Sequence, residues 1–167
     1  EDPDALASQL SAGGDGDLTV AASQHLHDIA EGKSGVDEWL AIYGHRAPDE
    51  FDLGAARWRE TPELVARLAE HMKGSTPPAE RHKTRADDVM DRAAQMSASL
   101  PPNRRDEFAE RLALVHRYIR FREDAKHYLM LGYDLLRDML LDAGRRLDIG
   151  DGASLLKIEE LHDALVW

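Results

Sequence analysis

The 167-residue chain contains no cysteine. This absence excludes a disulfide framework, thiolate metal sites and a cysteine nucleophile, and it fits a reducing compartment, so we expect a cytoplasmic protein. The sequence also lacks any run of about eighteen apolar residues, so we predict no membrane-spanning segment and no membrane partner. Phosphate-binding glycine loops, the HExxH zinc motif and the Gly-x-Ser-x-Gly nucleophile elbow are missing too. The sequence therefore carries none of these common catalytic or nucleotide-binding signatures.

Acidic residues outnumber basic ones by 32 to 21, which gives the chain a net charge of -11. A chain with this balance repels the phosphate backbone, so we expect no nucleic-acid partner. Hydrophobic residues make up 43% of the sequence, enough for a sizeable core. We therefore predict a single helical domain over residues 1–167. Because the sequence opens at Glu1 rather than at a methionine, we expect this domain to be a piece of a larger protein.

Apolar residues recur with the period of a helix along most of the chain, and no segment shows the alternation of a strand. Proline and glycine divide this pattern, because proline suits the first turn of a helix and glycine its C-terminal end. Helices are expected at 3–12, 17–30, 36–43, 61–74, 79–98, 103–144 and 158–166, with a glycine-rich loop at 13–16. The sequence thus predicts an all-α fold, a multi-helix bundle built round one long central helix. Its pattern leaves open whether that helix bends or breaks near 120–124.

The long helix carries a wide apolar face, made of two seams that lie about 100° apart. The seams contain Leu112, Val115, Ile119, Leu129, Tyr133, Leu136 and Leu140, and Leu114, Tyr118, Phe121, Ala125, Tyr128, Leu135 and Met139. An apolar face of this width predicts that the helix lies in the middle of the bundle, covered by its neighbours.

Two cations, Arg122 and Lys126, interrupt this apolar face one turn apart. A charge in an apolar environment is costly unless it is paired, so each of them needs a partner. One interpretation is structural: an internal ion pair, or long side chains that reach out to water. The other is functional: an open cleft in which two cations bind an anionic ligand such as a phosphate or a carboxylate. The spacing is compatible with both interpretations.

A second candidate region is the long irregular segment at 45–60, between two predicted helices. Ordered loops of this length are often functional, and aromatic residues are available to anchor this one. Its candidate binding residues are His45, Arg46 and Glu50. A structural alternative is that Arg46 and Arg57 cap helix carbonyls and pair with acidic residues of the same segment, such as Glu50. Spacing does not decide between the two.

The eight histidines raise the question of a metal site. Glu159 and His162 form one Glu-x-x-His motif of the kind found in di-iron bundles, but such a site needs a second motif and two further glutamates. The sequence contains no second motif, so we predict no metal site.

Two ordered blocks of sequence, within residues 36–165, are similar to one enzyme family. The first runs from Tyr43 to Leu53 (YGHRAPDEFDL) and continues from Arg57 to Glu63 (RWRETPE). The second begins with Arg122–Lys126 (REDAK) and continues with Leu136-Arg137, Gly144–Leu147 (GRRL) and Glu160-Leu161. By these blocks the chain resembles the phosphoenolpyruvate-synthase-like phosphotransferases, and most closely their rifampin phosphotransferase branch.

The resemblance implies an architecture and a reaction. Enzymes of this family have an ATP-grasp domain, a helical substrate domain and a swivelling phosphohistidine domain. ATP, with Mg²⁺, phosphorylates the mobile histidine, which carries the phosphoryl group to a small-molecule hydroxyl acceptor. This chain is similar to the helical acceptor-side domain, so its expected partners are the acceptor and the other two domains. It lacks the phosphohistidine motif and the ATP-grasp glycine loop, so we expect it to hold no cofactor and not to be catalytic alone.

The resemblance also implies roles for particular residues. In rifampin phosphotransferases the Arg and Lys of the Arg-Glu-x-x-Lys motif lie at the phosphoryl-acceptor site. By that match, Arg122 and Lys126 are the expected catalytic residues, which stabilise charge on the transferring phosphoryl group. The expected substrate-binding residues are Glu123, His45, Arg46 and Glu50. The alternative, from a different class of function, is a stand-alone helical module that holds a protein partner.

Overall fold

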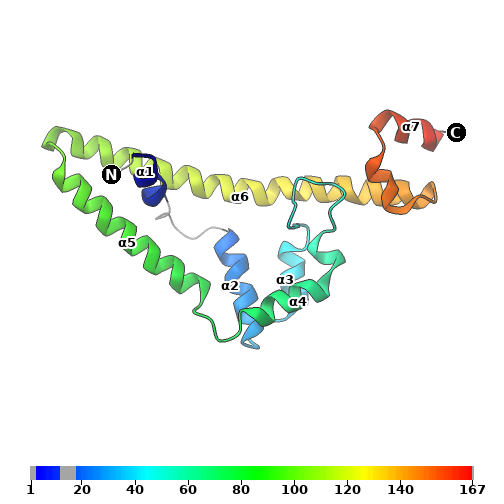
Figure 1. The fold of residues 1–167 in the computed structure, drawn as a ribbon, viewed down its shortest axis with the longest axis horizontal. Helices are drawn as coiled ribbons and strands as arrows, with labels where there is room; N and C mark the ends of the chain where they lie inside the picture. Colours follow the sequence, from blue (N-terminus) through cyan, green and yellow to red (C-terminus); the bar gives the residue numbers. More distant parts are fainter. Residues whose placement is uncertain (1–2, 12–17, 167) are drawn as a thin grey trace. The chain divides into compact units, whose positions relative to one another are not determined.

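The computed structural model describes residues 3–11 and 18–166, and within these ranges it contains helices, turns and loops but no strand. The elements are α1 (Pro3–Ser11), α2 (Leu18–Ala30), α3 (Val36–Tyr43), the 3₁₀ helix η1 (Trp58–Glu60), α4 (Pro62–His71), α5 (Pro78–Ser99), α6 (Pro102–Arg146), the 3₁₀ helix η2 (Gly150–Leu155) and α7 (Ile158–Val166) (Figure 1). The prediction of an all-α fold with one long helix is confirmed. The expected loop at 13–16 lies outside the described residues.

Proline and glycine set the helix boundaries where the sequence places them. Pro62, Pro78 and Pro102 each open a helix, since proline has its φ already fixed for the first turn and lacks an N–H that would be left without a partner there. Gly32 and Gly74 follow α2 and α4 with φ of +71° and +69°. This left-handed conformation is one that only glycine adopts without strain, and it ends both helices.

The chain divides into two compact units. The first contains residues 1–34 and 69–126. In it, α1 and α2 pack against α5, and its core is formed by Leu10, Val89 and Ala93. The ring of His116 on α6 bonds to the carbonyl of Leu10 at 2.7 Å. The core is therefore built where α1 and the N-terminal part of α6 meet α5.

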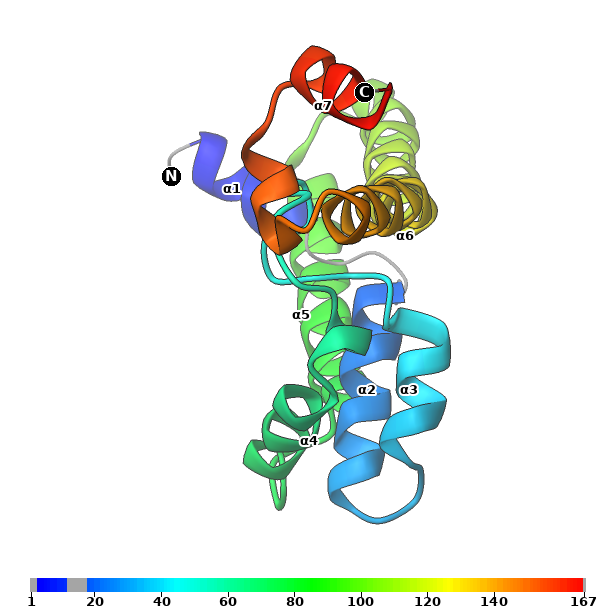
Figure 2. The same ribbon diagram turned by 90° about the vertical axis from the view of Figure 1, so that its right-hand side faces the viewer.

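The second unit contains residues 35–68 and 127–167. Its core includes Trp39 and Tyr43 of α3, whose ring centroids lie 5.2 Å apart. After α6 the chain turns back through η2 into α7 (Figure 2). Gly144 makes this turn possible, because a Cβ there would lie 2.0 Å from the carbonyl oxygen of Gly150. The structure thus divides the chain into two compact units. That residues 1–167 form a single domain stays a prediction.

Helix α6 is continuous from Pro102 to Arg146, so it has no break at 120–124. The expectation that its wide apolar face is buried is wrong: Tyr118, Phe121, Tyr128 and Leu135 are all more than half exposed. Of the predicted seams, Leu112 is covered in the first unit, but most of the covered surface lies on other faces. In the first unit the covered face follows Phe108, Leu112 and His116, and in the second it follows His127, Met130, Asp134 and Arg137. Among the helices described here, none is both long and apolar enough to span a bilayer.

Candidate functional site

The segment after α3 folds back on itself at Gly44. Arg59 N–H donates to the carbonyl of Gly44 at 3.0 Å, and Trp58 N–H donates to the carbonyl of Arg46 at 2.8 Å. A Cβ at position 44 would lie only 3.1 Å from the Cβ of Arg59, so glycine permits this close approach. The two bonds close residues 47–57 into a loop, and α6 from His127 onward supplies the other wall of a buried polar cluster.

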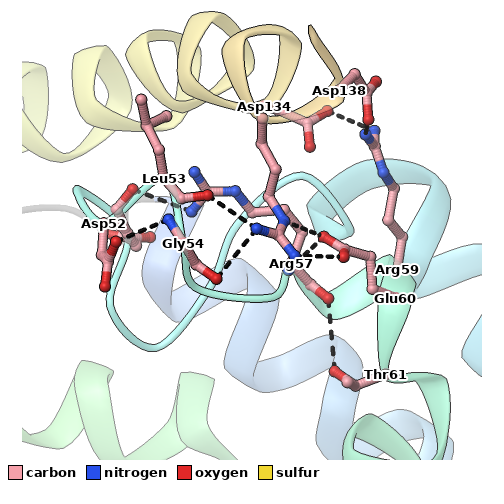
Figure 3. Close-up of polar contacts among 11 residues, drawn as sticks. Asp52, Leu53, Gly54, Arg57, Arg59, Glu60, Thr61, Asp134 and Asp138 are labelled. Atoms are coloured by element: carbon pink, nitrogen blue, oxygen red, sulfur yellow. Dashed lines mark hydrogen bonds and ion pairs between the residues drawn. The ribbon is translucent and has the colours of Figure 1, made fainter. Parts of the chain in front are cut away.

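Arg137 of α6 holds the loop through hydrogen bonds from all three nitrogens of its guanidinium group. Arg137 is 4% exposed. Its Nε and Nη2 bond to the two carboxylate oxygens of Glu60 at 2.6 and 2.8 Å, and its Nη1 donates to the carbonyls of Leu53 and Gly54 (Figure 3). This two-pronged hydrogen bond lowers the pKa of the Glu60 carboxyl, with smaller help from the Arg57 N–H. Charge-assisted pairs of this kind fix position and orientation together.

A second arginine, Arg59, bridges two carboxylates of α6. Figure 3 shows its guanidinium between Asp134 and Asp138, and both contacts measure 2.5 Å. Asp138 is more than half exposed, whereas the carboxylate of Asp134 is buried. Burial raises the pKa of Asp134, although the charge of Arg59 acts in the opposite direction. Arg59 thus links η1 to α6 across 75 residues of sequence.

A third arginine, Arg57, is fully enclosed, with no exposed surface. Its Nη1 donates to the carbonyl of Glu50 at 3.1 Å, and its backbone N–H donates to Glu60 Oε1 at 2.8 Å. Its Nε and Nη2 have no protein acceptor among the described residues. A buried guanidinium with unmet donors is costly. The loop therefore closes round a charge that it only partly satisfies.

Two histidines complete the cluster. His45 is 7% exposed, and its Nε2 lies 3.1 Å from the backbone carbonyl of His127. Because a carbonyl only accepts, Nε2 carries the proton in this bond. The two rings meet edge to face with centroids 4.5 Å apart. Burial lowers the pKa of His45, and the cations Arg46 and Arg59 lower it further, against the His127 carbonyl and Asp134, which raise it.

We expect the unfolding free energy of the protein to fall as the pH drops below the ordinary pKa of histidine, in part because of His45. A pKa that is depressed in the folded state stabilises the fold above the unfolded-state pKa and loses this contribution as the pH falls through the folded value. His45→Gln should therefore weaken the pH dependence between pH 8 and pH 5, measured by urea denaturation. His162→Gln, at an exposed histidine of α7, is the control. An unchanged pH dependence in His45→Gln would contradict the assignment.

The residues predicted from the sequence are divided between the two units. Arg122, Glu123 and Lys126 belong to the first. The side chain of Arg122 is 73% exposed, and its Nε and Nη2 bond to Glu123 Oε1 at 3.0 and 2.7 Å. Lys126 is half-buried. The expectation that both cations lie within a buried apolar face is therefore wrong for Arg122, because the face itself is exposed.

The other three predicted residues, His45, Arg46 and Glu50, belong to the second unit. Arg46 Nε bonds to Glu50 Oε1 at 2.5 Å, and both side chains are almost buried. The ion pair of the structural alternative is thus confirmed. The substrate-binding role of these residues stays a prediction.

The apolar seams predicted for the long helix include neither Asp134 nor Arg137, and the sequence predicts no site role for either residue. A signal was present. His127, Met130, Asp134 and Arg137 recur at steps of three and four, which places them on one helical face. Since three of the four are polar, a criterion based on hydrophobicity assigns this face to solvent, although it is the buried one.

Comparison with models of known families finds one that covers most of the chain. The model described as "Rifampicin phosphotransferase fourth domain" matches residues 2–123. The chain belongs to this family, and it is thus a domain of the phosphotransferase type. The match includes Arg122 and Glu123 but ends before Lys126. No curated protein and no solved structure matches the chain.

Proposed function

We propose that this chain is the acceptor-side domain of a dikinase-type phosphotransferase, which holds a hydroxylated small molecule while a phosphoryl group is delivered to it. The observation that carries the proposal is the position of Arg122. Its guanidinium is exposed on α6, within the stretch that matches the family. Tyr118, one helical turn before Arg122, and Phe121, its neighbour in the sequence, are also exposed. A cation next to aromatic surface suits an acceptor that is largely apolar and becomes charged during transfer.

In this proposal Arg122 and Lys126 stabilise the charge that develops on the transferring phosphoryl group. Phosphoryl transfer depends mainly on positioning and on electrostatic stabilisation by cations, so two basic side chains one helical turn apart are suitable. Glu123 holds the guanidinium of Arg122 through two of its nitrogens. The remaining nitrogen, Nη1, is then the donor that would face a phosphoryl oxygen.

His45, Arg46 and Glu50 have a different role in this proposal. Their side chains are largely buried and already engaged with each other or with the backbone. We therefore assign them to positioning within the second unit, where they fix the conformation of the 44–60 loop.

The complete reaction requires parts that this sequence does not contain. An ATP-grasp domain would use ATP and Mg²⁺ to phosphorylate a mobile histidine, and a phosphohistidine domain would bring that group to the acceptor. The chain by itself therefore binds the acceptor and does not turn it over.

The proposal predicts that the domain binds rifampicin, and inorganic phosphate more weakly, and that Arg122→Ala/Lys126→Ala weakens binding at least tenfold. A charge-assisted hydrogen bond contributes about 1.5–3 kcal/mol, and about 1.4 kcal/mol corresponds to a factor of ten. Isothermal titration calorimetry with circular dichroism measures both binding and folding. Arg145→Ala is the matched control, because Arg145 is an exposed arginine of the same helix that also pairs with a carboxylate.

Two results would contradict the proposal. One is a folded domain that binds neither ligand. The other is binding that the double variant and Arg145→Ala weaken equally, which would indicate non-specific attraction to positive charge.

A second candidate function is protein interaction. The observation that favours it is the row of exposed large apolar side chains on α6, among them Tyr128, Leu135 and Met139, since exposed apolar patches are often functional.

A further inference from the structure

In the second unit, helix α6 buries its more polar face and exposes its apolar one. Between His127 and Met139 its buried residues are His127, Met130, Asp134 and Arg137. The large apolar residues of the same stretch are between 47% and 65% exposed: Tyr128, Leu129, Leu131, Leu135, Leu136 and Met139. A helix of a water-soluble protein normally turns its apolar stripe to the core and its charges to water. This stretch does the reverse because its polar face is bonded to the 44–60 loop.

The exposed stripe can form the apolar centre of an interface. Burying a large apolar side chain removes on the order of 100 Å² from water, so six half-exposed side chains present a few hundred Å². The largest apolar patch of a typical monomeric protein is of this size, and it is often functional. A stable dimer needs about 800 Å² from each partner. The stripe is therefore the apolar centre of such an interface and not its whole area.

The spacing of the stripe is self-complementary. Tyr128, Gly132, Leu135 and Met139 follow each other at steps of four, three and four, which is the repeat of two helices that pack along a seam. When a second copy of this helix runs antiparallel, Tyr128 lies opposite Met139 of the other copy and Gly132 lies opposite Leu135. The flat ring of Tyr128 then packs against the flexible Met139, and the small Gly132 packs against the large Leu135, as close packing requires. The sulfur of Met139 meets an aromatic ring, which is a favourable contact.

The residues that flank this seam also fit the antiparallel arrangement. Leu129 lies opposite Leu136, and Leu131 lies opposite Asp138 of the other copy. No charge therefore faces a like charge across the seam, and Asp138 remains bonded to Arg59. A parallel arrangement would place Gly132 opposite Gly132 and leave a gap in the middle of the seam.

We propose that residues 128–139 of α6 form a two-fold, antiparallel contact between two copies of this chain. The contact is isologous, since each layer occurs twice about the symmetry axis. It gives the exposed stripe a partner of matching shape without moving the polar face away from the 44–60 loop. Because each copy carries a net charge of -11, added salt screens the repulsion between copies and should strengthen the dimer.

Sedimentation velocity over a concentration series tests the proposal, with Gly132→Phe as the decisive variant. A Cβ at position 132 meets no atom within 4 Å and Gly132 is exposed, so the new side chain starts from open space in the single chain. In the dimer, however, the new ring occupies the space of Leu135 from the other copy. We expect the dissociation constant to rise at least tenfold, whereas thermal unfolding of the dilute protein stays unchanged or shifts upward. Leu135→Asp should raise it about a hundredfold, since it buries an unpaired charge in the seam.

Leu114→Asp is the matched control, because Leu114 is a half-exposed leucine of the same helix outside the proposed contact. It should leave the dimer intact. A wild-type chain that stays monomeric up to about 1 mM overturns the proposal and leaves the stripe to a helix of another protein or domain. A dimer that Gly132→Phe leaves unchanged, or that Leu114→Asp disrupts, places the contact elsewhere and overturns it as well.

Single cysteines report the direction of the two helices, because the natural sequence contains none. In the antiparallel contact, a mixture of Gly132→Cys and Leu135→Cys proteins should form a mixed disulfide, since a disulfide requires Cβ atoms about 4 Å apart. Either protein alone should cross-link far more slowly. Rapid cross-linking of Leu135→Cys with itself indicates parallel helices and overturns the antiparallel arrangement.

Discussion

Arg137→Ala should lower the unfolding free energy by about 3–5 kcal/mol, the cost of removing one partner from a buried ion pair. Arg137 is almost fully buried and makes four hydrogen bonds, two to the Glu60 carboxylate and two to the carbonyls of Leu53 and Gly54. Truncation removes the Arg137 donor from all of these acceptors, and of the Glu60 oxygens only Oε1 keeps a bond, from the Arg57 N–H. Urea denaturation followed by circular dichroism measures the loss.

Two comparisons make this prediction specific. Arg145→Ala, which removes an exposed arginine paired with Asp142, should cost less than about 1 kcal/mol, as surface ion pairs do. The loss in Arg137→Ala should also shrink at acid pH. The pKa of Glu60 is lowered in the folded state, chiefly by Arg137. Its contribution is therefore present above the unfolded-state pKa and disappears as the pH falls through the folded value. A loss that is small at pH 7, or independent of pH, would contradict this role.

Gly144→Ala should destabilise the protein by about 3 kcal/mol, at the upper end of what overpacking costs. The added Cβ would lie 2.0 Å from the carbonyl oxygen of Gly150 and 2.9 Å from its carbonyl carbon. Both are main-chain atoms, so no side chain can turn aside to make room. The turn after α6 must open, which breaks the bond from Ile149 N–H to the Gly144 carbonyl. Denaturation of the dilute protein gives the value.

Gly132→Ala is the matched control for this substitution. Gly132 lies in the same helix, but a Cβ there meets nothing within 4 Å. Alanine in place of an unconstrained helical glycine stabilises by roughly 0.5–1 kcal/mol, so the two substitutions should have opposite signs. If both variants are destabilised alike, the close approach of Gly144 to the following turn is not the cause.

The buried polar cluster gives the second unit an unusual construction. Arg57, Arg59 and Arg137 hold the 44–60 loop to itself and to α6, where most helical domains would use apolar side chains. Charged hydrogen bonds are directional, so they define the course of an irregular loop more narrowly than apolar contacts do. The loop is thereby kept in one conformation.

Much of the fold follows from the sequence alone. Prolines at helix starts, glycines after helix ends and apolar residues at helical spacing are local signals, and they placed Pro62, Gly32 and Gly74 where the helices begin or end. The Arg46–Glu50 pair was also predictable, because its members are four residues apart. The membership of the phosphotransferase family is likewise carried by the order of residues in the chain.

Which face of α6 is covered was decided only by the tertiary structure. Periodicity shows that a helix has an apolar and a polar face, but it does not show which neighbour lies against either. The partners of Arg59 and Arg137 on the other segment are 75 and 77 residues away, so no local pattern reveals that these charges are neutralised. Burying a charge is unfavourable unless it is paired, so without these distant partners the sequence predicts that the apolar seams, and not the charged residues, form the buried face. Long-range ion pairs reversed that assignment in the second unit and left its apolar stripe exposed.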